Sequence, residues 1–97
     1  MKTLDEIKSI ITAHMDILKS QYKVKEIGVF GSFARGEQKK KSDVDILVEF
    51  IKPVGFIEFL KLEEYLGKLL GTKVDLVTRG ALKPYIGKRI LEEVVIV

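Results

Sequence analysis

Two aspartates stand two residues apart near the middle of the chain, at Asp43 and Asp45. They open a run rich in Val, Ile and Leu, which predicts a strand in which residues two apart project from the same face. Adjacent carboxylates repel each other, so such a pair is tolerated at a solvated strand end or is useful around a divalent cation. The pair alone is also compatible with an ordinary exposed surface, and the metal-binding interpretation needs further residues.

A third aspartate, Asp75, interrupts the otherwise apolar run 74–77, which predicts another strand. A lone aspartate is costly to bury, so we expect Asp75 to be paired or coordinated. A third carboxylate on a neighbouring strand would complete an oxygen-ligand set for two magnesium ions. That arrangement supports two-metal phosphoryl transfer.

Other types of metal ligand are scarce. The chain has no cysteine and a single histidine, His14, which excludes thiolate sites, cysteine nucleophiles and a His-rich zinc site. Any metal must therefore be bound by oxygen, as magnesium, manganese and calcium are. His14 falls on or beside the apolar stripe of a predicted helix, and we expect it at the edge of the core.

Gly31 and Ser32 follow a predicted strand over 24–30 and open a short helical turn that runs through Arg35. Glycine lets a phosphate approach the backbone, and the free amides of the turn, with the serine hydroxyl, can bind phosphate oxygens. Serine is also a common N-cap, so this pair alone has low specificity. Arg35 and the lysine run 39–41 add positive charge, either near a triphosphate or on a solvated loop.

The combination is more specific than its parts. Gly31-Ser32 is followed by ten residues and then by Asp43-Val44-Asp45, and Asp75 lies in a strand of its own. In this combination, and over nearly the whole chain, the sequence resembles the minimal nucleotidyltransferases of the DNA polymerase beta-type nucleotidyltransferase superfamily. The resemblance implies a small mixed β-sheet flanked by helices, similar to the polymerase beta palm.

The resemblance also implies a role for each motif residue. Asp43 and Asp45 would bind Mg²⁺, as two ions, together with the triphosphate of ATP. Asp75 would be the third carboxylate and would help to deprotonate the attacking hydroxyl. Gly31 and Ser32, with Arg35, would hold the phosphates of the nucleotide. The implied reaction transfers AMP to an acceptor hydroxyl and releases pyrophosphate.

The length of the chain bears on the acceptor. Larger relatives of this fold carry a helical acceptor-binding domain for which 97 residues leave no room, so we expect a small acceptor or one on another protein. Minimal domains of this family are commonly paired with a HEPN ribonuclease toxin, and act as its antitoxin by transferring AMP to a tyrosine of the toxin. The resemblance implies that partner here. The alternatives are a non-catalytic nucleotide-binding antitoxin that covers its partner and a small-molecule nucleotidyltransferase.

The composition predicts one globular domain over 1–97. With 46% hydrophobic and 32% charged residues, the chain is too apolar to be a disordered tail. No apolar run approaches the roughly 20 residues of a membrane span and no signal peptide is evident, so we expect a cytoplasmic protein. A net charge of +3 without interleaved aromatic and basic residues does not favour direct nucleic-acid binding.

The elements that must position the motif residues follow from the apolar spacing. A capping box at Thr3 and Glu6 begins the first helix, and Gly71 ends the second. Helical spacing predicts helices over 4–20, 56–70 and 84–93. Alternating and β-branched runs predict strands over 24–30, 43–50, 73–78 and 94–97. This order predicts an α/β fold, in which helices pack against a small sheet.

Overall fold

The computed structural model describes residues 2–82 and 84–97. In this part of the chain one four-stranded sheet forms, with the strand order β3-β2-β1-β4. Strand β1 pairs antiparallel with β2 and β4, whereas β2 and β3 are parallel, so the sheet is mixed as expected. The strands are β1 (Val24–Phe30), β2 (Val44–Phe50), β3 (Val74–Thr78) and β4 (Val95–Ile96).

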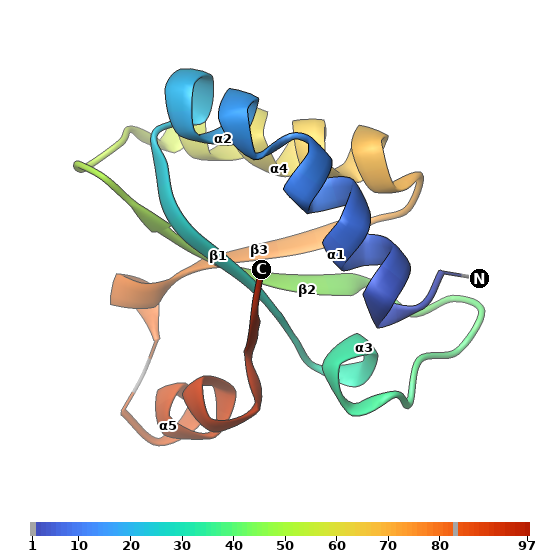
Figure 1. Cartoon of the computed structure of the whole chain (residues 1–97). Coiled ribbons are helices and arrows are strands. Elements are labelled where there is room, and N and C mark those ends of the chain that lie inside the picture. The colour runs from blue at the N-terminus through green and yellow to red at the C-terminus, as the bar shows by residue number, and fades with distance from the viewer. Residues whose placement is uncertain (1, 83) are drawn as a thin grey trace.

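Helices lie on both sides of the sheet (Figure 1). Three of them, α1 (Leu4–Ala13), α2 (Met15–Tyr22) and α4 (Phe56–Leu70), form a layer over one face. The short α3 (Ser32–Arg35) lies at the end of β1, and α5 (Pro84–Glu93) lies on the side of the sheet away from that layer. A 3₁₀ turn over Arg79–Ala81 follows β3.

The core lies between the sheet and the layer formed by α1, α2 and α4. Val44, Ile46 and Val48 of β2 are completely buried in it, as the alternation in this strand predicts. The helices contribute fully buried side chains at Ile7, Ile11, Leu18, Leu62 and Leu66. Because these three residues alternate along β2 and face the helices, the intervening residues, Asp45 among them, project from the opposite face.

The first helix departs from the prediction, because it is interrupted at His14 and continues as α2. The ring Nδ1 of His14 makes a 2.8 Å hydrogen bond with the Ile10 carbonyl oxygen, and the His14 amide donates instead to Ile11 O at 3.0 Å. A side chain that bonds the carbonyl four residues back competes with the helical hydrogen bond there. His14 itself is half-buried, in agreement with a place at the edge of the core.

The predicted helix ends are confirmed where a local signal specifies them. Thr3 and Glu6 form the capping box of α1. Gly71 ends α4 in the left-handed conformation, with φ of 66°. The predicted strands 43–50, 73–78 and 94–97 each occur in slightly shorter form.

Strand β4 returns the chain from α5 to the sheet through a close approach at Gly28. Gly28 is the partner of Ile96, and Val29 is the partner of Val95. A Cβ atom on residue 28 would lie 2.7 Å from Val94 Cγ2 and 3.0 Å from Val95 O. A glycine at this position is therefore what allows β4 to pair with β1.

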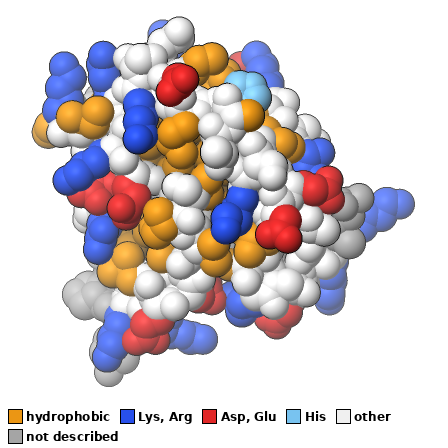
Figure 2. Space-filling view, viewed as in Figure 1, with side chains coloured by type: hydrophobic (Ala, Val, Ile, Leu, Met, Phe, Trp, Pro, Cys, Tyr) orange, Lys and Arg blue, Asp and Glu red, His pale blue; other side chains and the backbone are white. Residues whose placement is uncertain are grey.

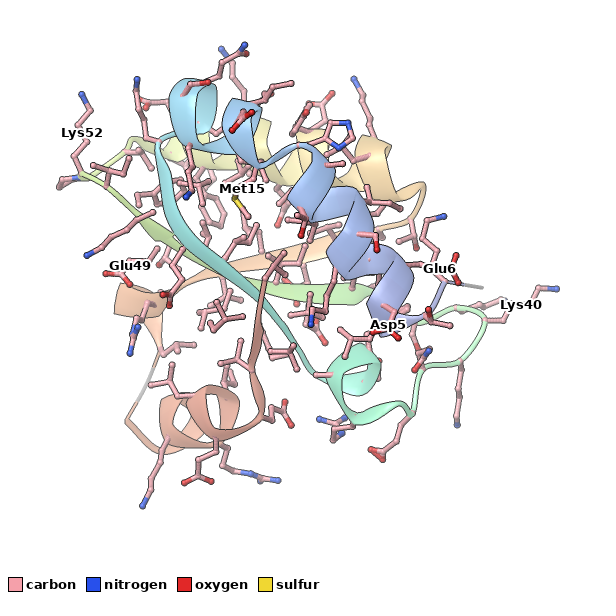
Figure 3. The ribbon with its side chains drawn as sticks, in the orientation of Figure 1. Asp5, Glu6, Met15, Lys40, Glu49 and Lys52 are labelled. Carbon is pink, nitrogen blue, oxygen red and sulfur yellow. The ribbon has the colours of Figure 1, made fainter. Side chains whose placement is uncertain are left out.

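The surface mixes charged and apolar side chains. Figure 2 shows hydrophobic side chains in patches between basic and acidic ones. In Figure 3, Lys40 lies at one end of the molecule and Glu49 with Lys52 at the other, while Met15 packs between the helices and the sheet. Within residues 2–82 and 84–97, no helix has the length and apolar character to cross a bilayer.

We predict that Gly28→Ala destabilises the protein, because the new methyl group would push β4 away from β1. Overpacking of this kind costs about 1–3 kcal/mol in the free energy of unfolding, measurable by chemical denaturation. Gly80→Ala is the matched control, since a Cβ atom there meets nothing within 4 Å. Equal stabilities of the two variants would show that the contact with β4 is not a constraint.

Candidate active site

The register of the sheet brings two of the predicted carboxylates together. Asp45 of β2 is the direct partner of Asp75 in the parallel strand β3 and of Phe30 in the antiparallel strand β1. Asp43 immediately precedes β2, and its side chain is 44% exposed. All three aspartates therefore lie at the same end of the sheet, where β2 begins and β1 ends.

Gly31 directly follows the last residue of β1 and lies beside these aspartates. Its φ of 74° lies in the region that residues with a side chain rarely adopt. A Cβ atom on residue 31 would collide with the Asp45 carboxylate. The backbone of the Gly31-Ser32 turn thus lies directly against Asp45, and the predicted phosphate-binding residues adjoin the predicted metal-binding residues.

The cost of burying a lone aspartate does not apply to Asp75 in the folded chain. Asp75 is exposed, because β3 is an edge strand and its Asp75 projects from the face that α1, α2 and α4 leave uncovered. Asp45, in the neighbouring central strand, is half-buried. Asp75 lies beside Asp45 because the parallel pairing of β2 with β3 aligns the two residues.

The electrostatics of the site centre on Asp45. Burial raises the pKa of Asp45 above its ordinary value, and the negative charges of Asp75 and Asp43 raise it further, while Arg35 lowers it. Asp43 also lies 3.9 Å from Lys73 Nζ, in an exposed ion pair. Asp43 and Asp75 are therefore each close enough to repel Asp45, and a bound cation would relieve that repulsion.

The carboxylates do not form a closed metal cage. In the parts of the chain that the structure describes, no three histidine or acidic side chains are arranged to hold a metal ion as they stand. The donors nevertheless fit a hard divalent cation, because they are all carboxylate oxygens and Asp45 is repelled by both of its acidic neighbours. A cation there would require the side chains to turn toward it.

Glu93, the last residue of α5, contacts two of the predicted site residues, although no motif in the sequence assigns it a role. The Gly31 amide donates to Glu93 Oε1 at 2.9 Å, and Arg35 Nη1 donates to Oε1 and Oε2 at 3.2 and 3.0 Å. Burial alone would raise the pKa of Glu93, but the bonds from Gly31 and Arg35, and the charges of Arg35 and Arg89, lower it below its ordinary value. Glu93 lies 62 positions after Gly31 in the sequence, so no local pattern reveals the contact.

Arg35 is the basic residue that the structure places beside the Gly31 turn. Its Nε donates to Glu37 Oε1 at 2.7 Å, in addition to the ion pair with Glu93. The lysines 39–41 are exposed on the following loop. Lys39 and Lys40, with Ser42, line a cavity of about 330 Å³ beside that loop.

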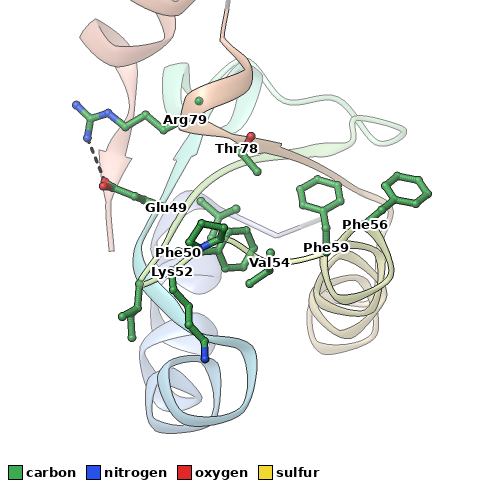
Figure 4. A pocket seen from close by; sticks show the side chains of 13 residues that line it. Glu49, Phe50, Lys52, Val54, Phe56, Phe59, Thr78 and Arg79 are labelled. Carbon is green, nitrogen blue, oxygen red and sulfur yellow. Dashed lines mark hydrogen bonds and ion pairs between the residues drawn. The ribbon is translucent and has the colours of Figure 1, made fainter.

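A larger cavity, of about 610 Å³, lies at the opposite end of β2 (Figure 4). Phe56 and Phe59 of α4 line one side, and the ion pair between Arg79 and Glu49 lies on another. None of the predicted site residues lines it. The predicted site residues therefore lie at the charged end of the sheet, away from this cavity.

We predict that Asp45→Asn stabilises the protein at pH 7. A pKa raised by burial and by neighbouring carboxylates means that the ionised form of Asp45 is unfavourable in the folded state, and the amide removes that charge. Thermal unfolding should show a higher melting temperature for Asp45→Asn than for the wild type. The exposed Asp16→Asn serves as the control, and a lower melting temperature for Asp45→Asn would contradict the prediction.

We predict that the stabilisation from Glu93 depends on pH. Because its folded pKa lies below the ordinary value of 4.5, its contribution is fully present above that value and is lost as the pH falls through the folded pKa. The stability difference between the wild type and Glu93→Gln should therefore be larger at pH 7 than at pH 3. Denaturation curves at both values test this, and a difference that stays constant would contradict it.

The chain is similar to known proteins in both sequence and fold. Residues 11–97 match the family model of the nucleotidyltransferase domain. The protein adenylyltransferase MntA of Thermococcus cleftensis is 55% identical over 97 residues, which cover all of this chain and 98% of that protein. A solved structure described as a candidate minimal nucleotidyltransferase is 31% identical, with a TM-score of 0.82 over 97% of this chain and 95% of that one.

A more distant match shows the fold alone. It is a chain of the complex between a tri-AMPylated HEPN toxin and an MNT antitoxin of Shewanella oneidensis, at 20% identity. Its TM-score is 0.68 over 93% of this chain and 70% of that one. Taken with the site geometry, the family match and the MntA relative lead to one conclusion: the chain belongs to the nucleotidyltransferase domain family, as a minimal member close to the MntA protein adenylyltransferases.

Proposed function

We propose that this chain is a magnesium-dependent protein adenylyltransferase that transfers AMP from ATP to a tyrosine hydroxyl of a partner HEPN toxin, and thereby acts as its antitoxin. The observation that carries the proposal is the alignment of Asp45 with Asp75, with the Gly31 backbone packed against Asp45. This arrangement puts a backbone turn suited to phosphates next to carboxylates suited to a cation.

The glycine-serine turn binds the triphosphate. The absence of a side chain at Gly31 lets phosphate oxygens approach the backbone, and the Ser32 hydroxyl adds a hydrogen-bond donor. The guanidinium of Arg35 supplies positive charge next to the turn. These groups orient the nucleotide so that its α-phosphorus faces the acidic end of the sheet.

The aspartates serve the transfer step. Asp75, which is exposed, accepts the proton of the acceptor hydroxyl. The acceptor oxygen then forms a bond to the α-phosphorus, and the bond from that phosphorus to the bridging oxygen of the β-phosphate breaks, so that pyrophosphate leaves. Asp43 and Asp45, with Asp75, would hold Mg²⁺, which when bound neutralises charge on the attacking and leaving oxygens.

The acceptor is inferred from the relatives. The Thermococcus cleftensis protein is named as a protein adenylyltransferase, and the Shewanella oneidensis complex contains an AMPylated HEPN toxin. The open position of Asp75 supports a macromolecular acceptor, because a side chain of another protein can reach an exposed carboxylate. ATP is the nucleotide that the AMPylation of that toxin implies.

The proposal predicts label transfer from α-labelled ATP to the HEPN protein encoded by the adjacent gene. With Mg²⁺ present, the wild type should label that protein, and Asp43→Asn should reduce the rate at least about 100-fold, on the order of a lost catalytic group. Asp16→Asn, an exposed acid outside the site, is the matched control and should keep full activity. Chelation of the metal by EDTA should abolish AMP transfer by the wild type and by Asp16→Asn.

The same assay separates the alternatives. Asp43→Asn that still neutralises the toxin at wild-type strength would overturn the enzymatic role in favour of a binding antitoxin. ATP consumption with no label on any protein would favour a small-molecule acceptor. A tyrosine-to-phenylalanine series in the HEPN partner would identify the acceptor residue, and transfer that survives every such change would contradict a tyrosine acceptor.

A further inference from the structure

The Glu93 carboxylate bonds two parts of the proposed nucleotide site at once. It accepts a hydrogen bond from the Gly31 amide, and both of its oxygens accept from Arg35 Nη1. Glu93 lies in α5, at the far end of the chain from the glycine-serine turn. None of the roles that the family resemblance implies involves this residue.

Gly31 is held between two carboxylates. The side chain of Asp45 lies where a Cβ atom of residue 31 would be, and the Gly31 amide donates to Glu93. The Gly31 carbonyl oxygen accepts from the Arg35 amide at 3.1 Å, and the Gly31 amide has the Glu93 carboxylate as its acceptor. Glycine at φ of 74° has more backbone freedom than other residues, so such bonds are needed to fix its conformation. The hydrogen bond to Glu93 therefore provides a specific restraint on the turn.

Glu93 is itself held in place by the sheet. The Val94 amide donates to Ile90 O at 2.9 Å, so the last turn of α5 continues through Glu93. Val95, two residues after Glu93, pairs with Val29 in β1, and Val29 lies two positions before Gly31. The carboxylate is therefore attached through β4 to the same strand that delivers the glycine.

We propose that Glu93 is a positioning residue for the nucleotide: it sets the conformation of the Gly31 turn and the direction of the Arg35 guanidinium, and so prepares both for the triphosphate. This inference rests on the proposed function, because it assumes that the turn and Arg35 bind the phosphates.

Removal of the carboxylate has two consequences. The Gly31 amide, which lies in a part-buried hydrogen bond, loses its acceptor, and an unpaired buried donor is costly. Arg35 keeps only its exposed partner Glu37, and its guanidinium turns away from the glycine. Both changes disorganise the phosphate-binding groups before the nucleotide arrives.

Glu93 could also weaken nucleotide binding, which is the opposite of what positioning predicts. A carboxylate beside the phosphates repels them, and a carboxylate bound to the Gly31 amide and to Arg35 occupies donors that phosphate oxygens could use. If competition dominated, removal of Glu93 would tighten nucleotide binding. The sign of the change in affinity therefore distinguishes positioning from competition.

The test measures the dissociation constant of ATP with Mg²⁺ and the KM and kcat of AMP transfer for Glu93→Ala and Glu93→Gln. We expect Glu93→Ala to weaken ATP binding about tenfold, on the order of one charge-assisted hydrogen bond, and to raise the KM for ATP more than it lowers kcat. Glu93→Gln should be weakened less, because its amide oxygen still accepts from Gly31. Glu92→Ala, an exposed neighbour, is the matched control and should bind as the wild type does.

Melting curves accompany the binding assay. If Glu93→Ala is unfolded at the assay temperature, the ATP affinity of Glu93→Gln provides the test. Weaker ATP binding by Glu93→Gln supports the positioning role, and unchanged or tighter binding overturns it. Unchanged or tighter binding by folded Glu93→Ala overturns it as well. A wild type that binds no ATP would instead overturn the proposed function, and this inference with it, whereas unaffected Glu93 variants of an ATP-binding protein would overturn this inference alone.

Discussion

Parallel pairing of β2 with β3 sets Asp45 beside Asp75, and the repulsion between these like charges must be offset elsewhere in the fold. The same strand provides the compensation. Its alternate residues, Val44, Ile46 and Val48, are completely buried under the helices, so burial of apolar surface stabilises the strand that carries the unfavourable charge. One strand thus supplies the centre of the core on one face and the half-buried Asp45 carboxylate on the other.

Gly31 connects this acidic end to the rest of the molecule. Asp45 packs against it from β2, and Glu93 bonds its amide from the end of α5, so the glycine links the middle and the end of the chain. The pairing of β4 with β1 makes this possible, and that pairing in turn depends on the missing side chain at Gly28. Gly28 in β1 and Gly31 directly after it therefore serve different purposes: Gly28 allows β4 to pack, and Gly31 forms part of the proposed site.

The location of the site also shows why chemistry is a better guide here than shape. The cavity of about 610 Å³ near Phe56 is largely apolar and lies at the other end of β2 from the aspartates. The proposed nucleotidyl transfer needs positive charge beside the triphosphate. Asp43, Asp45 and Asp75 could supply it by holding a divalent cation, and an apolar cavity could not. The proposed function therefore assigns the reaction to the acidic end of the sheet.

The sequence by itself determined the α/β class, the strands, most helix boundaries and the motif from Gly31 to Asp45, because local spacing and turn chemistry specify these features. Only the tertiary structure decided that Asp75 stands beside Asp45 while remaining exposed, that the first helix breaks at His14, and that Glu93 reaches Gly31. The pairing of β2 with β3 and the contact between Gly31 and Glu93 join groups that are distant in the sequence, the second pair by 62 positions. The break at His14 results from competition between a side chain and a backbone amide for one carbonyl. No local sequence pattern encodes these relations.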